Sequence, residues 1–308
     1  MDETTENVIT DESDLFLQTV PRTLVHRAGV AEVFVTGIRQ IGPDHFRIGA
    51  QWPRSHSYYG PVARRWHDPM LFAETARQAL LLISHQGYGV PIGHQFLYRD
   101  GSHDITPDGV RLTDRPAHVL LDVRCSDVKL RGGTVSKFFA RIECLRDGEH
   151  VGTSSMTVTA MSPQLYRRVR GEACGSTPQR ALPEPVTPSS VGRYLDSDVV
   201  LGATGVDRTW TLRADTDHAV LFDHPVDHIP GIVLMEAARQ ASLSVLGRPH
   251  ALAVAMDCAF EQYVEYSKAC VITAGEAVPG PENTWRVKVD FAQGGTIAAS
   301  IHVNLTAS

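Results

Sequence analysis

The chain has 308 residues, of which 43% are hydrophobic and 21% charged, a composition typical of soluble globular proteins. Its formal net charge of −6 argues against general nucleic-acid binding, and no apolar run approaches the ~18 residues of a membrane-spanning helix. Residues 1–14 lack the basic start and apolar core of a signal peptide. The five cysteines form no zinc-like cluster, so we expect a reduced cytoplasmic protein without disulfides, metal or cofactor.

The first half of the chain predicts one long helix among strands. Alternating and β-branched residues predict strands at 32–37 and 45–52. A helix is expected at 69–84, because proline suits the first helical turn and Gly87 follows as a stop signal. Further strand-like runs follow at 117–130, 135–145 and 151–161.

A proline-rich segment separates the two halves. Prolines at 163, 178, 183, 185 and 188 predict a linker at 163–190 with neither a helix nor a central strand. The chain is long enough for two domains of about 150 residues. We therefore expect a flexible tail at 1–20, one domain at 21–162 and another at 191–308.

The second half repeats the order of the first. Strands are expected at 208–214 and 219–222, and a helix at 230–246 with Gly247 as its stop signal. Strand-like runs follow at 251–266, 269–277, 284–291 and 296–305. One apolar helix followed by several strands indicates an α+β class, in which an antiparallel sheet wraps around a central helix. The prediction is two tandem hotdog domains that pair within one chain as a pseudo-dimer.

The two predicted helices share a polar string. ETARQA at 74–79 recurs as EAARQA at 236–241, identical at five of six positions, which marks an internal repeat. Glu74, Arg77 and Gln78 therefore share one helix face. Glu236, Arg239 and Gln240 repeat the arrangement. A buried ion pair that fixes the packing is one interpretation, and a polar patch lining a site is the other; the repetition favours a site.

Further candidate residues precede the helices. His224 and His228 come just before the second helix, whose first backbone N–H groups, near Gly231, are candidates for binding an oxyanion. Arg54 and His56 are a second candidate phosphate group, although ordinary surface charges fit them equally well.

The segment from Asp223 to Gln240 resembles the signature of hotdog β-hydroxyacyl-carrier-protein dehydratases, although the spacing from His224 to Pro230 is shorter and Arg239 precedes the glutamine. The chain is more similar to the tandem-hotdog A-factor biosynthesis family of actinobacteria. That resemblance rests on VHR at 25–27, EVFVTG at 32–37, WPRSHSYY at 52–59, DPMLFAETARQA at 68–79 and YGVPIGHQF at 88–96.

The resemblance implies an acyltransferase. It would join a β-ketoacyl group, carried as an acyl-carrier-protein thioester, to the hydroxyl of dihydroxyacetone phosphate. The ester, closed to a butenolide phosphate, is the precursor of a γ-butyrolactone- or furan-type hormone that controls antibiotic production. By motif match, Glu74, Glu236 and Arg239 are the expected catalytic groups.

The chemistry needs a base, an oxyanion donor and a cation for the phosphate. We expect Glu236 to be the base, with a pKa raised by burial, and Arg239 to hold the phosphate or Glu236. Glu74 would act at a second pseudo-symmetric site or be a structural remnant. Arg77, Gln78 and Gln240 are expected to bind substrate. Cys258 and its counterpart in the other half, Cys125, fit buried packing better than a covalent acyl-cysteine.

The sequence does not decide the docking surface for a partner, and it leaves alternative functions open. Carrier proteins are acidic, so docking requires a local basic patch, for which Arg64, Arg65 and the linker arginines 167, 168 and 170 are candidates. A thioesterase or dehydratase acting on acyl carrier protein, and a non-catalytic acyl-binding regulator, are the alternatives. The tandem repeat permits a monomer, and assembly into a homo-oligomer is left open.

Overall fold

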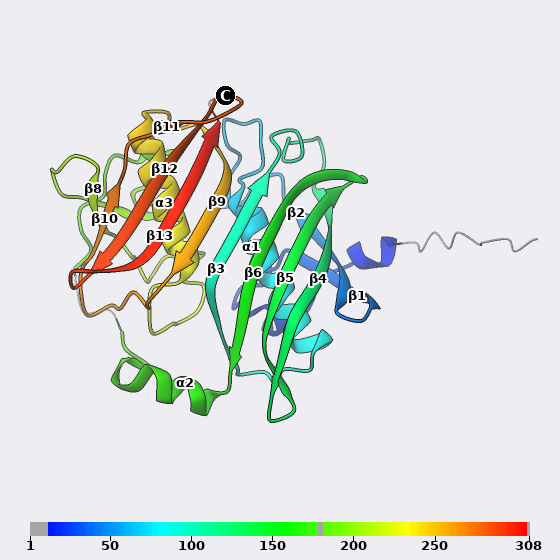
Figure 1. Cartoon of the computed structure of the whole chain (residues 1–308). Coiled ribbons are helices and arrows are strands. Elements are labelled where there is room, and N and C mark those ends of the chain that lie inside the picture. The colour runs from blue at the N-terminus through cyan, green and yellow to red at the C-terminus, as the bar shows by residue number, and fades with distance from the viewer. Residues whose placement is uncertain (1–11, 178–180, 307–308) are drawn as a thin grey trace, which may run out of the picture.

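Two long helices pack against one antiparallel sheet in the computed structural model, which describes residues 12–177 and 181–306 (Figure 1). Helix α1 (Met70–Leu82) belongs to the first repeat and α3 (Gly231–Leu246) to the second. All but one of the α1 residues are buried, which matches its almost uniformly apolar sequence. These two helices, covered by the sheet, form the core of the tandem hotdog fold.

The sheet runs through both repeats in the order β1-β2-β4-β5-β6-β3-β9-β13-β12-β10-β8-β7, with β11 paired to β12. The first repeat contributes β1 (Val35–Gly42), β2 (His45–Trp52), β3 (Gln95–Ile105), β4 (Ala117–Arg131), β5 (Thr134–Arg146) and β6 (Glu149–Met161). The second contributes β7 (Leu201–Ala203), β8 (Thr209–Leu212), β9 (Leu252–Phe260), β10 (Cys270–Ala274), β11 (Val278–Pro279), β12 (Thr284–Gln293) and β13 (Thr296–Thr306).

The repeats join where β3 pairs with β9. The two strands are antiparallel, with Ser102 opposite Asp257, so the sheet continues from one repeat into the other. Strand β3 was not predicted from the sequence. Its Arg99, Asp100 and Asp104 interrupt the apolar alternation by which the other strands were recognised, and most of the strand is partly exposed.

Both long helices and most strands are confirmed, with small shifts at their ends. The strand predicted at 219–222 is wrong, because His218 Nδ1 accepts the N–H groups of Val220 and Leu221 and holds this segment as a turn. The strand predicted at 251–266 ends at Phe260, after which the N–H of Glu261 bonds to Ala298 O.

The linker differs from its prediction, because it contains helix α2 (Pro163–Arg170). Ser162 accepts the N–H of Leu165 at 3.3 Å, and proline is tolerated in the first turn, where its missing N–H has no helical partner. Within the predicted tail, residues 1–11 lie outside the described part of the chain. Ser13–Phe16, by contrast, form a 3-10 turn with Leu15 buried.

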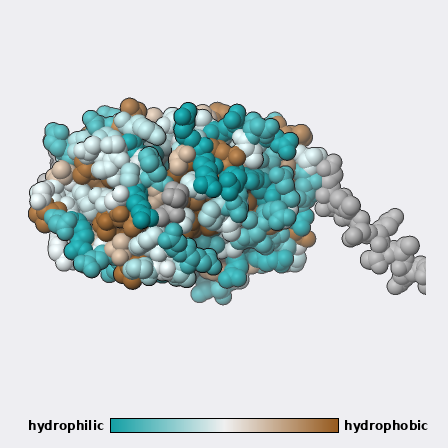
Figure 2. Space-filling model, turned by 90° about the horizontal axis from the view of Figure 1, so that it is seen from above, coloured by the Kyte–Doolittle hydropathy of each residue, from teal (hydrophilic) through white to brown (hydrophobic). Residues whose placement is uncertain are grey.

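Within the described ranges, no helix is long and apolar enough to cross a membrane. On the face seen in Figure 2, hydrophobic residues form small patches separated by hydrophilic ones. The described cysteines, all five of the sequence, are free thiols.

Strands β3 and β6 approach each other so closely at Gly152 that a side chain has no room there. Gly152 lies opposite Ile105, and a Cβ added to it would lie 2.1 Å from the backbone oxygen of Asp104. We expect Gly152→Ala to lower the free energy of unfolding by about 1–3 kcal/mol, because the strands must separate. The control is Gly42→Ala, whose added Cβ meets only His45 Cβ at 3.7 Å. Equal urea midpoints for the two variants would contradict so close an approach of the two strands.

Candidate functional site

Glu74 is fully buried on α1 and is held by three side chains. Its Oε1 accepts Arg27 Nε at 3.0 Å and Gln78 Nε2 at 2.7 Å, and it lies 2.6 Å from Arg27 Nη2. Arg77 donates to both carboxylate oxygens, at 2.9 Å each. A buried carboxylate is stable only when it is paired and hydrogen-bonded, and these donors meet that requirement.

Glu236 on α3 has the same surroundings. Arg193 Nε donates to its Oε1 at 3.0 Å, Gln240 Nε2 donates to the same oxygen at 2.6 Å, and Arg239 donates to both oxygens at 2.8 and 2.9 Å. The predicted Glu-Arg-Gln face is therefore one part of a larger network that each repeat builds once.

The two glutamines fasten each helix to the segment that precedes the sheet. Gln78 donates to Glu32 O at 2.7 Å and accepts the N–H of Phe34 at 2.9 Å. Gln240 makes the same pair of bonds, to Asp198 O and from the N–H of Val200. Part of each network is thus structural, as the alternative interpretation of the repeat proposed.

Arg27 and Arg193 were not among the predicted site residues. They belong to a second, weaker repeat, at residues 25–33 and 191–199. In each copy a valine comes two residues before the arginine, and an acidic residue followed by valine comes five residues after it. Aligning the halves on these positions pairs Arg27 with Arg193 and Glu32 with Asp198, the residues that the structure places equivalently.

The expectation of a raised pKa for Glu236 is wrong. Burial alone acts to raise it, but the guanidinium groups of Arg193 and Arg239 outweigh burial and lower the pKa to about 2. The pKa of Glu74 is likewise lowered to about 2 by its two arginines, against the effect of burial. Both carboxylates are therefore ionised, hydrogen-bonded anions at neutral pH, which makes them weak proton acceptors.

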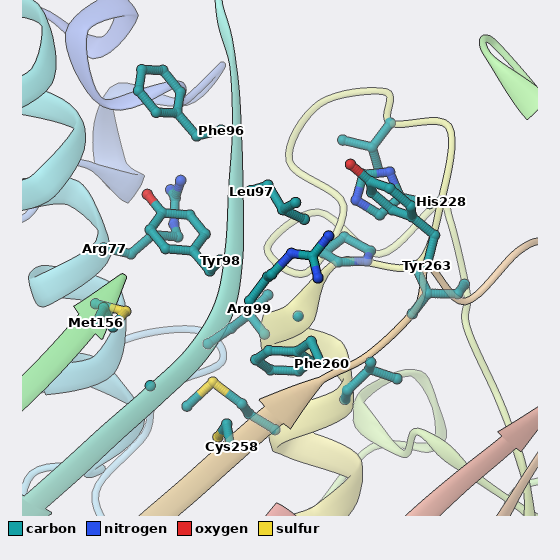
Figure 3. A pocket seen from close by; sticks show the side chains of 18 of the residues that line it. Arg77, Phe96, Leu97, Tyr98, Arg99, Met156, His228, Cys258, Phe260 and Tyr263 are labelled. Carbon is teal, nitrogen blue, oxygen red and sulfur yellow. The ribbon is translucent and has the colours of Figure 1, made fainter. Parts of the chain in front are cut away.

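An inner cavity of about 360 Å³ lies between the repeats, beside Glu74's network. Its polar lining includes Arg27 and Arg77 from the first repeat and His224 and His228 from the second. Figure 3 shows Arg77 beside Tyr98 on one side of β3, with His228, Tyr263 and Phe260 on the other. The apolar wall includes the residues Leu81, Leu97, Met156, Ile232, Met235 and Phe260.

A much smaller cavity lies at the start of α1, also between the two repeats. This cavity of about 20 Å³ lies between the first turn of α1, the end of β3 and the start of β9. Asp68 accepts the N–H of Met70, the first residue of α1, at 2.9 Å, and Tyr58 lies over Arg193 with its ring centroid 3.9 Å from the guanidinium carbon. The side chain of Arg77 is 23% exposed, whereas that of Arg239 is 6% exposed.

An outer cavity of about 720 Å³ adjoins the inner one. The two share six lining residues: His26, Arg27, Gln95, His224, Val226 and His228. Each of the two predicted histidines contacts the preceding aspartate, His224 Nδ1 with Asp223 at 3.3 Å and His228 Nδ1 with Asp227 at 2.8 Å.

Some of the predicted residues line these cavities and others do not. Arg77, Gly231, His224 and His228 line the inner cavity. Neither cavity is lined by Glu74, Gln78, Glu236, Arg239 or Gln240. Arg54 donates to Thr113 O, and His56 Nδ1 accepts the N–H groups of Tyr58 and Tyr59; neither residue lines the inner or the outer cavity. Cys258 lines the inner cavity, and burial raises the pKa of its thiol to about 12, which does not favour a nucleophilic thiolate.

Comparison with known proteins decides the family. The model of the A-factor biosynthesis hotdog domain matches twice, at residues 9–162 and 175–308. The chain belongs to the A-factor biosynthesis hotdog family. It is 44% identical over 265 residues to a 2-oxo-3-(phosphooxy)propyl 3-oxoalkanoate synthase of Streptomyces virginiae, covering 86% of this chain and 90% of that one. A synthase of the same name from Streptomyces griseus is 36% identical, covering 88% of this chain and 90% of that protein.

Solved structures confirm the fold of this family member. The 12:0-ACP thioesterase from Umbellularia californica matches with a TM-score of 0.53 at 10% identity, covering 88% of this chain and all of that one. A putative oleoyl thioesterase from Lactobacillus plantarum matches with a TM-score of 0.51 at 13% identity, covering 87% and 99%. At these identities the likeness concerns architecture alone.

The lowered pKa values of the two buried carboxylates predict how the free energy of unfolding depends on pH. The folded pKa of each, about 2, lies below its ordinary value of 4.5, so the stability each contributes is present above pH 4.5. It is lost as the pH falls toward 2, on the order of 3 kcal/mol for each carboxylate. Urea unfolding at several pH values between 6 and 2.5 measures this slope.

The variant Glu236→Gln serves as the comparison. It leaves Arg193 and Arg239 without their anion, so we expect a loss of about 3–5 kcal/mol at pH 7 and a shallower decline on acidification. Wild-type stability that increases as the pH falls from 4.5 would instead indicate a raised pKa, as the sequence analysis expected.

Proposed function

We propose that this chain is an acyltransferase that joins a 3-oxoacyl group to the hydroxyl of dihydroxyacetone phosphate. The product is the phosphorylated ester from which a γ-butyrolactone- or furan-type signalling hormone is made. Relatives over most of the chain carry a synthase name that describes this ester. The observation that carries the proposal is a single inner cavity with an apolar wall for an acyl chain and two guanidinium groups for a phosphate.

The free donors of the first arginine pair, Arg27 and Arg77, support binding of the phosphate in the inner cavity. Among the described residues, Nη1 of Arg27 and Nη1 of Arg77 have no hydrogen-bond acceptor. In the other repeat, Arg193 Nη1 donates to Tyr58 O at 2.7 Å, and Arg239 Nη1 lies 3.9 Å from Asp68 Oδ2. Guanidinium donors bind phosphate well, and in this protein only the first pair offers them to a cavity within the described ranges.

The start of α3 supports the position of the thioester. Gly231 lines the inner cavity, and no side chain caps this helix. Its first N–H groups therefore have no helical partner and can stabilise the oxyanion that forms when the hydroxyl attacks the thioester carbonyl. The start of α1 is unsuited to that role, because Asp68 already occupies the N–H of Met70.

Glu74 has a supporting role in this proposal, in which it orients Arg27 and Arg77 toward the cavity. Glu236 and Arg239 maintain the matching network in the second repeat. Direct roles of Glu236 and Arg239 in the chemistry, as the sequence analysis assigned them, stay predictions that the variants below separate.

An acyl carrier protein is the proposed acyl donor, with the outer cavity as the entrance. Arg22 and Arg167 line this cavity and are exposed, which suits an acidic partner and its phosphorylated arm. Of the other docking candidates, Arg170 is buried against Asp227 and Glu265, and the pair at 64 and 65 lies away from both cavities. A cytoplasmic location is part of the proposal and agrees with the free thiols.

The direct test is mass analysis of the products that purified protein forms from a 3-oxoacyl carrier-protein thioester and dihydroxyacetone phosphate. We expect a phosphorylated ester and free carrier thiol. Release of the 3-oxo acid alone would indicate a thioesterase, and an unchanged bound thioester would indicate an acyl-binding protein; either result would reject the acyltransferase.

The equivalent arginines 77 and 239 provide a matched pair of variants for the same assay. Arg77→Lys keeps the charge but loses the forked geometry in the cavity, so we expect KM for dihydroxyacetone phosphate to increase at least about 10-fold. Arg239→Lys should lower the melting temperature and leave this KM within about 2-fold, because Arg239 does not line a cavity. The reverse pattern would place the phosphate at the second network.

A further inference from the structure

A pair of histidines at the wall of the inner cavity has no role in the proposal so far. His26 Nε2 lies 2.9 Å from His85 Nε2, and the two rings are 5.1 Å apart between centroids. His85 follows α1 in the π-helical turn Ile83–Gly87, and His26 follows the short turn Arg22–Val25. His26 lines both cavities, whereas His85 is buried behind it.

The hydrogen bonds fix where the protons are. His85 Nδ1 lies 2.7 Å from Val90 O, and because a carbonyl oxygen only accepts, Nδ1 must carry the hydrogen. Burial lowers the pKa of His85, so its ring is neutral and its Nε2 has a lone pair. The hydrogen between the two rings therefore belongs to His26 Nε2.

This assignment leaves the lone pair of His26 on Nδ1. Among residues 12–177 and 181–306, no donor contacts that atom, and the ring borders both cavities. The chain Val90 O, His85 and His26 thus orients a neutral imidazole with its acceptor nitrogen unpaired, which is the arrangement that a general base needs.

The backbone at His26 is also specialised. Its φ of 52° and ψ of 55° lie in the left-handed region, which is uncommon for residues other than glycine. The reversal at this position lets His26 line the cavities while the next residue, Arg27, reaches Glu74. Unusual backbone conformations of this kind concentrate at functional sites.

Burial and the neighbouring basic side chains keep His26 neutral. Burial is the main cause that lowers its pKa to about 4, and His85, Arg77 and His224 lower it further. These groups approach from the turn after α1, from α1 itself and from the loop before α3. An uncharged imidazole is thus available to accept a proton at neutral pH.

We propose that His26 is the general base of the reaction and that His85 is a positioning residue that holds it in the productive tautomer. This inference rests on the proposed acyltransferase function. The hydroxyl oxygen of dihydroxyacetone phosphate forms a bond to the thioester carbonyl carbon, and its proton passes to His26 Nδ1. The tetrahedral intermediate then breaks the C–S bond, and the proton passes from His26 to the leaving sulfur, which gives the ester and the carrier thiol.

Two other groups near the cavity are less suited to this role. Glu74 is fully buried, and both of its oxygens are occupied by guanidinium donors. His224 has a partner in Asp223, but that carboxylate already accepts the N–H groups of Ala28 and Gly29 at 2.6 and 2.9 Å, shorter than its 3.3 Å contact with His224. The His26 tautomer is set by closer contacts.

The test measures ester formation in full-length variants at saturating substrates. His26→Asn suits the left-handed backbone but cannot accept the proton, so we expect kcat to fall at least about 100-fold with little change in KM for dihydroxyacetone phosphate. His85→Phe removes the acceptor for His26 Nε2–H and should lower kcat at least about 10-fold. His85→Gln offers an amide oxygen in its place and should retain most of the rate.

The possible outcomes distinguish a failure of the proposed roles of His26 and His85 from a failure of the proposed acyltransferase function. Wild-type protein that forms no ester would reject the acyltransferase itself. Wild-type protein that forms the ester, with folded His26→Asn doing so at a similar kcat, would overturn the role of His26. If His224→Gln alone abolished turnover, the base would be His224. Equal losses in His85→Phe and His85→Gln would show that His85 only supports the fold and would overturn its positioning role.

Discussion

A carboxylate inside a helix that is buried on almost every side must be surrounded by donors, because an isolated buried charge is too costly to keep. Glu74 and Glu236 meet this constraint in the same way, each with two arginines and one glutamine. Each network also fixes the helix to the segment preceding the sheet. The arginine side chains are positioned by the need to neutralise these two anions. The guanidinium groups that line the cavity are therefore a consequence of the buried carboxylates.

Although the same types of donor surround the two glutamates, the surroundings of the two networks differ. In the second repeat, Tyr58 O accepts Arg193 Nη1 and Asp68 forms an ion pair with Arg239 at 3.9 Å, and the cavity beside the first turn of α1 holds only about 20 Å³. In the first, the outward donors of Arg27 and Arg77 border a cavity of about 360 Å³. A pseudo-dimer within one chain permits this division, because each half is free to carry different residues, whereas a symmetric homodimer repeats every residue. One half can then serve the substrate while the other supports the fold.

The sequence predicted the helices, the tandem hotdog fold and the polar face at 74–78 because these depend on local patterns and on an obvious repeat. It did not identify Arg27 as the partner of Glu74, because the two are 47 positions apart and only the fold brings them together. Strand β3 was missed because its charged residues conceal its alternation. The difference between the two sites was beyond reach, since it arises from Tyr58 and Asp68 of one repeat contacting arginines of the other.

The central claim is that the phosphate of the substrate binds at the first network and not at the second. A crystal structure of the protein with dihydroxyacetone phosphate bound tests it most directly. The account predicts the phosphate in the inner cavity, bound to Nη1 of Arg27 and Arg77, with Tyr58 still lying over Arg193. A phosphate bound to Arg193 or Arg239, after displacement of Tyr58, would contradict it.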